Sequence, residues 1–263
     1  MLDNGKEIDW SKASADYAKY RDIYPDELYT ALSFFGIGKA GQHILDIGTG
    51  TGVIVRRLYK TGAVLTGTDI AENQIHYART LSADAGMDIR YEVSGAECLP
   101  FADNSFDAAT AFQCWMYVDK ARAVPELSRV LKPGGKLVIG YMAWLPEENE
   151  IVRASLETVN SFNPDWNGFD KRAECAVPAW ADAADWARKF RMTAWQVFDA
   201  DIPFTYESWN GRMKASRGVG ASLSAAETER FSQAHLAVLK SLTADIFTIR
   251  HEIALMVFEN LKG

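Results

Sequence analysis

Apolar and polar positions follow two periods along the first half of the chain. Short runs of apolar, β-branched residues predict buried strands, and runs with apolar residues three or four positions apart predict amphipathic helices. The predicted strands cover residues 43–47, 64–68, 88–93, 106–112 and 136–142, and the helices between them cover residues 53–60, 72–85 and 119–131. Strands that alternate with helices in this way predict a parallel sheet with helices on both faces.

Segments outside this alternation are predicted to cover the sheet. They are an N-terminal helical cover and two helical lid insertions, residues 1–35, 146–192 and 206–243. Two short helices are expected within the first segment, at residues 14–21 and 26–35. Two further strands, 193–204 and 247–258, are expected to pair with each other and to close one edge of the sheet. We interpret the insertions as a lid and not as a separate domain.

Composition excludes several classes of protein. The chain has 263 residues, enough for one large α/β domain with a sizeable core, and a net charge of −7. That charge argues against a general surface for nucleic acid or for an anionic membrane. Three cysteines without metal-ligand spacing predict reduced thiols, no metal site and a cytoplasmic location. No signal segment or run of transmembrane length is present.

A glycine-rich segment follows the first predicted strand. The strand at 43–47 runs directly into Gly48-Thr49-Gly50-Thr51-Gly52, and a helix follows. This order places main-chain N–H groups and the positive end of a helix dipole at one point, and glycines let a ligand approach the main chain closely. Asp69 ends the next strand, where its carboxylate can accept hydrogen bonds from both hydroxyls of a ribose. The pattern indicates a nucleotide-type ligand.

The spacing of the glycines separates two kinds of nucleotide ligand. A dinucleotide-binding turn has the pattern Gly-x-Gly-x-x-Gly, followed by an acidic residue about 20 positions later. Here the third glycine comes one position early, at Gly52, and Val53 occupies its usual place. An NAD-dependent enzyme is therefore the weaker interpretation of this segment.

Five segments in a fixed order carry a resemblance to a known family. They are Leu45–Gly52, Gly67-Thr68-Asp69-Ile70, Gly95–Phe101, Asp103-Asn104-Ser105-Phe106-Asp107 and Arg129–Gly135. Together they resemble the class I S-adenosylmethionine-dependent methyltransferases, in the type 11 group of small-molecule enzymes. The resemblance covers residues 14–145 closely and the later strands by topology only. It implies an α/β, Rossmann-like, mostly parallel seven-stranded sheet with the last strand antiparallel, in a single methyltransferase domain spanning residues 1–263.

The resemblance also implies which residues bind S-adenosylmethionine. Asp46 would face the ammonium group of the methionine part, Asp69 would hold the ribose diol, and the main chain of Gly48 to Gly50 would meet the carboxylate and the ribose. Ile70 and Leu99 would enclose the adenine. The full set expected to bind the cofactor is Tyr17, Arg21, Asp46, Gly48, Thr49, Gly50, Asp69, Ile70, Gln74, Ala96, Glu97 and Gln113.

Several of these residues also have a purely structural interpretation. Tyr17 and Arg21 resemble an N-terminal Tyr-x-x-x-Arg element that folds over the cofactor, where Arg21 would pair with its carboxylate. The same two side chains could form an ordinary exposed helix face. Glu97 could be a solvated acid, and Gln113 a structural amide. Cys98 and Cys114 are expected to fill space and not to react.

Candidate substrate residues come from the end of the fourth strand and from the insertions. They are Trp115, Tyr117, Trp144, Trp209, Arg212, Arg217 and His251. Aromatic rings together with two arginines indicate a small acceptor that is anionic or partly aromatic. The alternative is that the aromatic residues form core and the arginines face solvent. No catalytic residue is assigned, because a general base is needed only if the acceptor carries its proton at the working pH.

Two functions from different classes remain open on the sequence. The first is methyl transfer to a small-molecule acceptor by in-line displacement, with no nucleic acid or membrane partner and with the chain as a monomer or homodimer. The second is a non-catalytic S-adenosylmethionine-binding sensor or accessory protein. The (Asn/Asp)-Pro-Pro-(Tyr/Phe) signature of nucleic-acid and glutamine methyltransferases is absent after the fourth strand.

Overall fold

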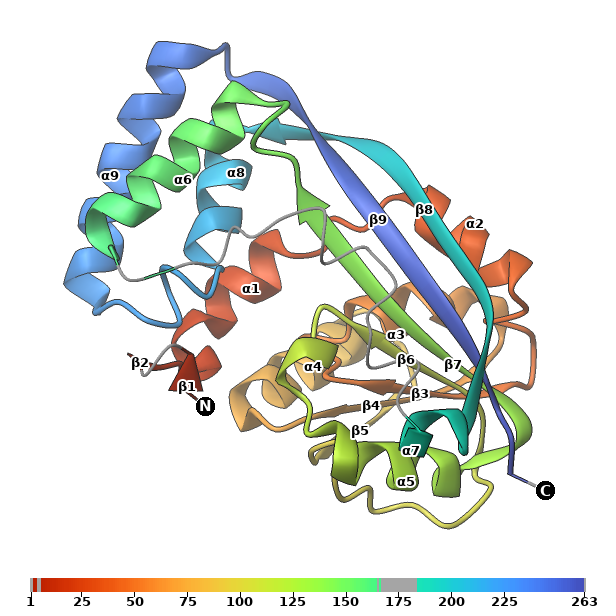
Figure 1. Ribbon diagram of the computed structural model, residues 1–263. Coiled ribbons are helices and arrows are strands. Elements are labelled where there is room, and N and C mark those ends of the chain that lie inside the picture. Colours follow the sequence, from red (N-terminus) through yellow and green to blue (C-terminus); the bar gives the residue numbers. More distant parts are fainter. Residues whose placement is uncertain (1, 4–5, 165, 167–183, 263) are drawn as a thin grey trace. The chain divides into compact units, whose positions relative to one another are not determined.

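The computed structural model describes residues 2–3, 6–164, 166 and 184–262 (Figure 1). Seven strands form one sheet in the order β5-β4-β3-β6-β7-β9-β8. Their bounds are β3 His43–Ile47, β4 Val64–Asp69, β5 Arg90–Val93, β6 Phe106–Phe112, β7 Leu131–Trp144, β8 Phe190–Thr205 and β9 Ile246–Asn260. Six strands are parallel and the last is antiparallel, which confirms the predicted fold class.

Helices precede the first strand of this sheet and connect its strands along the chain. They are α1 Ser14–Tyr20, α2 Asp26–Phe34, α3 Val53–Leu58, α4 Glu72–Asp84, α5 Lys120–Val130, α6 Glu150–Phe162, α7 Ala184–Ala187, α8 Tyr206–Lys214 and α9 Ala225–Leu242. A short hairpin, β1 Leu2–Asp3 with β2 Lys6–Glu7, precedes them and was not expected from the sequence. The tryptophan-rich part of the first predicted insertion lies largely outside the described residues, and so does Cys175.

The chain divides into two compact units. The glycine-loop unit consists of residues 25–142, 174–198 and 253–263, and the helical unit consists of residues 1–24, 143–173 and 199–252. Strands β7, β8 and β9 contribute residues to both units. The interpretation of residues 1–263 as a single domain with a lid stays a prediction.

The core of the glycine-loop unit forms around the central strand β3. Ile44, Leu45 and Ile47 are buried at 1% exposure or less, because β3 has a strand on each side and helices supply cover. β4 and β6 pair with it in parallel register, with Asp46 opposite both Gly67 and Thr110. A parallel strand buried on both faces is continuously apolar in sequence, which explains why this strand was predicted with its observed bounds.

Strand β7 begins earlier than the sequence predicted. It was expected at Lys136, yet it starts at Leu131, which pairs with Phe106, while the next pair is Lys136 with Ala108. The residues between form a bulge, and Gly134 within it has a φ of +70°, a conformation that glycine adopts without strain. The strand therefore begins before the glycines: Leu131 pairs with Phe106, and the regular ladder starts after the bulge.

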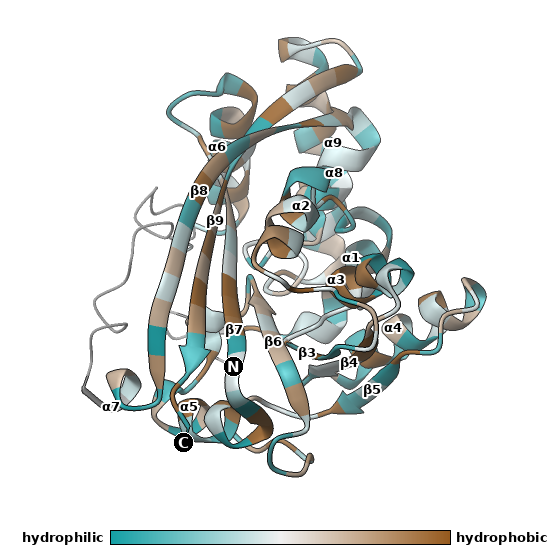
Figure 2. Cartoon of the chain, turned by 90° about the vertical axis from the view of Figure 1, so that its right-hand side faces the viewer, coloured by the Kyte–Doolittle hydropathy of each residue, from teal (hydrophilic) through white to brown (hydrophobic). Residues whose placement is uncertain are grey.

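The last two strands differ in their hydropathy (Figure 2). β9 lies between β7 and β8, and its residues from His251 to Val257 are all buried. β8 forms the edge of the sheet, and its side chains alternate between more and less exposed positions along most of the strand. The expectation that these two strands pair and close one edge is confirmed.

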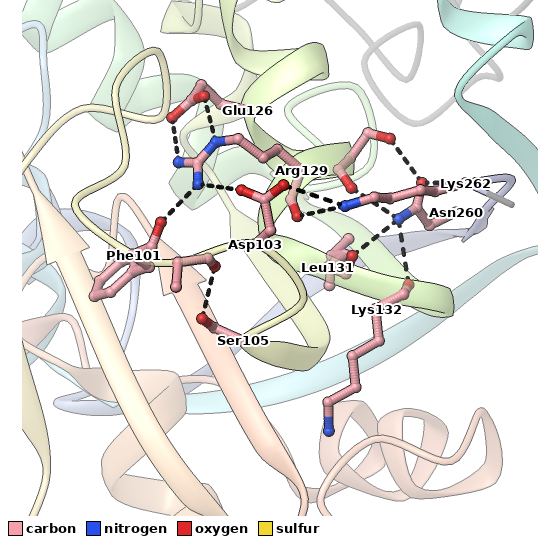
Figure 3. A network of polar contacts seen from close by, with 11 residues as sticks. Phe101, Asp103, Ser105, Glu126, Arg129, Leu131, Lys132, Asn260 and Lys262 are labelled. Atoms are coloured by element: carbon pink, nitrogen blue, oxygen red, sulfur yellow. Dashed lines mark hydrogen bonds and ion pairs between the residues drawn. The ribbon is translucent and has the colours of Figure 1, made fainter.

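A network centred on Arg129 fixes the loop that follows β5 (Figure 3). The Arg129 guanidinium, on α5, donates to both carboxylate oxygens of Glu126, at 2.8 and 2.9 Å, and to the main-chain oxygens of Leu99 and Phe101. It also donates to Asp103 at 3.0 Å. Five donors in a rigid fork suit this role, which a lysine could not fill. The network explains physically why Arg129 and the Leu99-Pro100-Phe101 segment belong to one sequence pattern.

Helices α1, α6, α8 and α9 form the body of the helical unit. α1 packs on α8, where the Tyr20 ring occupies the space that a Cβ on Gly211 would need, at 2.2 Å. Lys19 pairs with Glu207 at 2.8 Å along the same contact. Within the part of the chain that the structure describes, no helix is long and apolar enough to cross a membrane.

Candidate functional site

The glycine segment forms the turn between β3 and α3. Gly48, Gly50 and Gly52 have φ values of +60°, +56° and +79°, which side chains other than glycine adopt only with strain. There is also no room for a side chain at Gly48, because a Cβ there would lie 2.5 Å from the Cβ of Cys114. The turn is therefore specified by its glycines. Gly48 is exposed, whereas Thr49 and Gly50 are buried and their N–H groups donate to the Thr68 oxygen and to Asp69.

Gly52 gives a direct test of this packing. A Cβ there would lie 2.4 Å from the hydroxyl of Tyr91, and φ is positive. We expect Gly52→Ala to lower the free energy of unfolding by roughly 2–4 kcal/mol, from backbone strain and overpacking together. In a Tyr91→Phe background the loss should be smaller, because the contacting oxygen is absent. Chemical denaturation of the four proteins measures the coupling, and strictly additive losses would contradict the contact.

Asp69, at the end of β4, is anchored by main-chain donors. One carboxylate oxygen accepts from the Gly50 N–H and the other from the Ala71 N–H, both at 2.9 Å. Each oxygen keeps further lone pairs for other donors. Burial raises the pKa of Asp69, while the hydrogen bonds from Ala71 and Gly50 lower it. The carboxylate is thus held at a fixed position beside the glycine turn.

Asp46, one residue before the end of β3, is 2% exposed. Its carboxylate accepts a hydrogen bond of 2.6 Å from the hydroxyl of Thr110, on the adjacent strand β6. Burial raises the pKa of Asp46 to about 6, against the lowering effect of the Thr110 hydrogen bond. No sequence signal identified Thr110, because its role depends on the register of two neighbouring strands.

Several buried polar atoms near the glycine turn have no hydrogen-bond partner among the residues that the structure describes. They include Oγ1 of Thr51, Oγ1 of Thr68 and Oε1 of Gln74. Gln74, a predicted cofactor residue, is 3% exposed and lies in the first turn of α4. Buried polar groups are usually paired, and unpaired ones concentrate at functional sites.

The predicted adenine-binding residues are unevenly exposed. Ile70 is 59% exposed and presents an apolar surface directly after Asp69. Leu99 is only 4% exposed, and its N–H donates to Glu126, so it belongs to the core of the loop. Ala96 is buried, and Glu97 accepts a hydrogen bond of 2.9 Å from the Asp119 N–H. Ile70 is thus available to a ligand, whereas Leu99 is not.

Gln113 and Cys114 follow β6, and the Cys114 side chain lies against the glycine turn. Gln113 has a φ of +58°, an uncommon value for a residue with a side chain, and its Nε2 donates to the main-chain oxygen of Met142. The Cys114 thiol donates to the Ile47 oxygen at 3.1 Å, and burial raises its pKa well above the ordinary value. The Gln113 amide therefore has a structural role, the hydrogen bond to Met142. Cys114 fills space beside the turn.

Two predicted substrate residues lie in the 3₁₀ turn Trp115–Tyr117 of the same unit. Trp115 is fully buried and packs edge-to-face on Trp186, with ring centroids 5.7 Å apart. Its environment is that of a core side chain. Tyr117 is half-buried, and its N–H donates to the Cys114 oxygen at 3.0 Å.

The remaining candidates lie in the helical unit. Arg21 follows α1, and its guanidinium stacks on the Tyr17 ring at 4.7 Å and donates to the Tyr17 hydroxyl at 3.4 Å. Arg217 is half-buried, and its main-chain oxygen accepts from the Ser222 hydroxyl. The roles of these residues toward a cofactor or substrate stay predictions.

Four other side chains and Arg212 form a compact aromatic group, which we call the Arg212 cluster. Its members are Trp144, Phe204, Trp209, Arg212 and His251, from the ends of β7 and β8, from α8 and from β9. The Arg212 guanidinium lies 4.8 Å from the centroid of the Trp144 ring, and the rings of Trp144 and Trp209 are 5.6 Å apart. The sequence prediction that Trp144, Trp209, Arg212 and His251 come together is consistent with this geometry.

His235 in the same unit has a structural role. Its Nδ1 lies 2.9 Å from the Asn210 side-chain oxygen and its Nε2 lies 2.9 Å from the Ser155 hydroxyl, so both ring nitrogens are paired. The Trp209 indole N–H donates to the same hydroxyl. Among the described residues, no group of three or more His, Cys, Asp or Glu side chains could hold a metal ion.

Comparison with known proteins agrees with this geometry. Residues 45–139 match the family model described as a methyltransferase domain, of the type 11 group. An uncharacterized methyltransferase of Mycobacterium bovis is 32% identical over 152 residues, which cover 55% of this chain and 59% of that protein. A demethylmenaquinone methyltransferase of Thermus thermophilus is 33% identical over 142 residues, which cover 53% of this chain and 56% of that protein. The alignments thus span less than two thirds of either relative.

The fold has a counterpart among solved structures. A crystal structure from Bacillus halodurans, named there as a candidate methyltransferase, matches with a TM-score of 0.54 and 20% identity, covering 88% of this chain and 97% of that one. At this identity the match shows the fold alone. The matched domain and the named relatives support a class I S-adenosylmethionine-dependent methyltransferase, and the solved structure shows that the chain has the corresponding fold.

Proposed function

We propose that the chain transfers a methyl group from S-adenosylmethionine to a small-molecule acceptor. The observation that carries the proposal is the position of Asp69, which the N–H groups of Gly50 and Ala71 hold beside the glycine turn. A carboxylate fixed in this way at the end of the second strand of a parallel sheet is suited to accept hydrogen bonds from both hydroxyls of a ribose.

The other groups of the turn fit the cofactor's chemistry. Gly48 is the exposed residue of the turn, and with no side chain of its own it lets a ligand approach its main chain closely. Asp46 places a buried carboxylate where an ammonium group would be favoured, and an ammonium group beside it would lower its pKa. Ile70 offers an exposed apolar surface to the face of an adenine ring. These three features fit S-adenosylmethionine, and the buried acid Asp46 supports it over a dinucleotide, whose pyrophosphate needs no buried acid.

The transfer itself asks little of the side chains. S-adenosylmethionine supplies a methyl group on a positively charged sulfur that leaves readily. The protein's task is to hold the acceptor in line with that methyl group and to exclude water. Asp46 and Asp69, from adjacent strands, would fix the ammonium group and the ribose on either side of the sulfur, so that the motion of the methyl group between them is small. No general base is assigned to this step.

Incubation with S-adenosylmethionine and a panel of small metabolites tests the proposal. Formation of S-adenosylhomocysteine that depends on one acceptor is the expected result. Tight binding of S-adenosylmethionine by calorimetry, with no product from any acceptor, would favour the non-catalytic sensor or accessory protein instead. Tighter binding of NAD than of S-adenosylmethionine would exclude both functions.

A further inference from the structure

Arg212 carries a charge that the fold of the helical unit leaves unbalanced. It is 4% exposed, and within the described part of the chain its Nε and Nη1 have no hydrogen-bond partner. No carboxylate among residues 6–164, 166 and 184–262 forms an ion pair with it. Burial, followed by the charge of Arg21, lowers the pKa of Arg212. A buried charge without a partner destabilises a folded chain, so this arrangement has a cost that the apolar packing around it does not recover.

The surroundings of Arg212 are aromatic. The Trp144 ring lies against the guanidinium at 4.8 Å, the Trp209 ring lies 5.6 Å from that of Trp144, and Phe204 packs on Trp209 at 4.9 Å. A cation over an aromatic face gains some stabilisation, yet it leaves the N–H donors unused. The ligand that completes this environment has one charged end that uses these donors and an apolar body that contacts the rings.

His251 adds a hydrogen-bond acceptor to the donors of Arg212. Its Nδ1 donates to the Ile249 oxygen at 3.0 Å, and burial lowers its pKa to about 3, so the ring is neutral. Nε2 is then a bare acceptor, and among the described residues it has no partner. His251 contacts the same aromatic group, since its ring centroid lies 6.4 Å from that of Trp209. His235, by contrast, has both nitrogens paired.

We infer that the Arg212 cluster binds a small carboxylate with an apolar body, whose oxygens accept hydrogen bonds from Arg212 and which presents one donor to Nε2 of His251. This inference rests on the proposed function in one respect: the carboxylate is taken to belong to the methyl acceptor. A planar carboxylate matches the fork of a guanidinium, and one guanidinium balances one negative charge. A dianionic phosphate would bring a second charge among these rings.

Pairs of acids and their neutral amides test the inference without any turnover. Benzoate, phenylacetate and hexanoate are each compared with the corresponding amide, at saturating S-adenosylhomocysteine, through thermal stabilisation and quenching of tryptophan fluorescence. We expect at least one acid to bind roughly tenfold or more tightly than its amide. If no acid is preferred over its amide by the unmodified protein, the inference is wrong.

Two variants locate the effect. Arg212→Met keeps a side chain of similar length without the charge, and Arg250→Met removes an exposed arginine of the same unit, paired with Asp201. Only the first should abolish the preference for the acid. It should also raise the melting temperature of the ligand-free protein, because an unbalanced buried charge is removed. An arginine with a purely structural role would give the opposite shift. If Arg212→Met does not fold, Arg212→Gln takes its place in the acid–amide comparison, and loss of the preference for the acid in that variant supports the inference.

The source of the carboxylate is settled by a separate measurement. S-adenosylhomocysteine carries its own carboxylate, so its affinity is measured by calorimetry for the unmodified protein and for Arg212→Met. We expect the affinity to be unchanged. A tenfold loss in the variant, or competition between S-adenosylhomocysteine and the acid, would assign Arg212 to the cofactor and overturn the assignment to the acceptor. Absence of turnover with preserved acid binding would count against the proposed function and not against this site.

Discussion

Replacing Asp69 with alanine is expected to weaken the binding of S-adenosylhomocysteine by roughly 1.5–3 kcal/mol, or roughly 10- to 150-fold. The Gly50 and Ala71 N–H groups hold the carboxylate in place, and each of its oxygens keeps a lone pair that could accept from the proposed ribose. Loss of a charged acceptor to two hydroxyls accounts for this magnitude. Titration calorimetry of the two proteins measures it.

The variant also releases two main-chain donors, so the ribose contact needs its own control. A 2′-deoxy analogue of S-adenosylhomocysteine lacks one of the two hydroxyls. The unmodified protein should bind the analogue more weakly than the parent ligand, and Asp69→Ala should bind both about equally. An equal penalty for the analogue in both proteins would show that Asp69 only supports the turn and does not contact the ribose.

Asp46→Asn is expected to stabilise the ligand-free protein at pH 8. Burial raises the pKa of Asp46 from 3.8 to about 6 in the folded chain, so the ionised form costs roughly 3 kcal/mol of folding free energy above that pH. The sign follows from proton binding: between pH 3.8 and about 6 the folded chain holds a proton that the unfolded chain has lost. The contribution of Asp46 to stability is therefore greatest at low pH and falls as pH rises through about 6.

Asparagine keeps an oxygen that can accept from the Thr110 hydroxyl and carries no charge. Denaturant unfolding at a series of pH values should show an advantage of the variant at pH 8 that shrinks steadily toward pH 4. Asp84→Asn, at an exposed position of α4, controls for the change in net charge. Equal stability of Asp46→Asn and the unmodified protein at pH 8 would contradict the raised pKa. Loss of cofactor binding alongside the gain would show that the turn trades stability for its ligand.

Most of the glycine-loop unit could be predicted from the sequence because its strands are buried on both faces. β3 and β6 have the predicted bounds, since each is an apolar run that ends at residues of a different kind. β7 was predicted to start five residues too late, because a bulge with Gly134 resembles a turn in sequence. The division of the chain into two units depends on contacts between distant segments, and no local pattern in the sequence carries them.

The candidate site was predictable where one residue's position fixes its role. Asp46 and Asp69 were predicted because an acid near the end of a parallel strand beside a glycine turn has few structural alternatives, and the structure places both carboxylates beside that turn; their roles toward the cofactor stay predictions. Leu99 is buried, which a loop leucine does not reveal in sequence, and its assignment to the adenine stays a prediction. Trp115 shows the same difficulty: a tryptophan after a strand can line a site or fill a core, and this one is fully buried.

The two histidines of the helical unit show most clearly what could not be predicted from the sequence. Both His235 and His251 have polar and apolar neighbours in the sequence, and both are fully buried in the structure. Only hydrogen bonding separates them, because Ser155 and Asn210 pair both nitrogens of His235, while one nitrogen of His251 has no partner in the described part of the chain. These partners come from other helices, 25 and 80 residues away in the sequence.

Titration calorimetry with S-adenosylhomocysteine and with NAD, under the same conditions, tests the central claim most directly. The claim is that the turn from Gly48 to Gly52, together with Asp46 and Asp69, is built for the methyl donor. Saturable binding of S-adenosylhomocysteine at one site per chain, with NAD bound far more weakly or not at all, is the predicted result. Tighter binding of NAD, or no binding of S-adenosylhomocysteine, would contradict it.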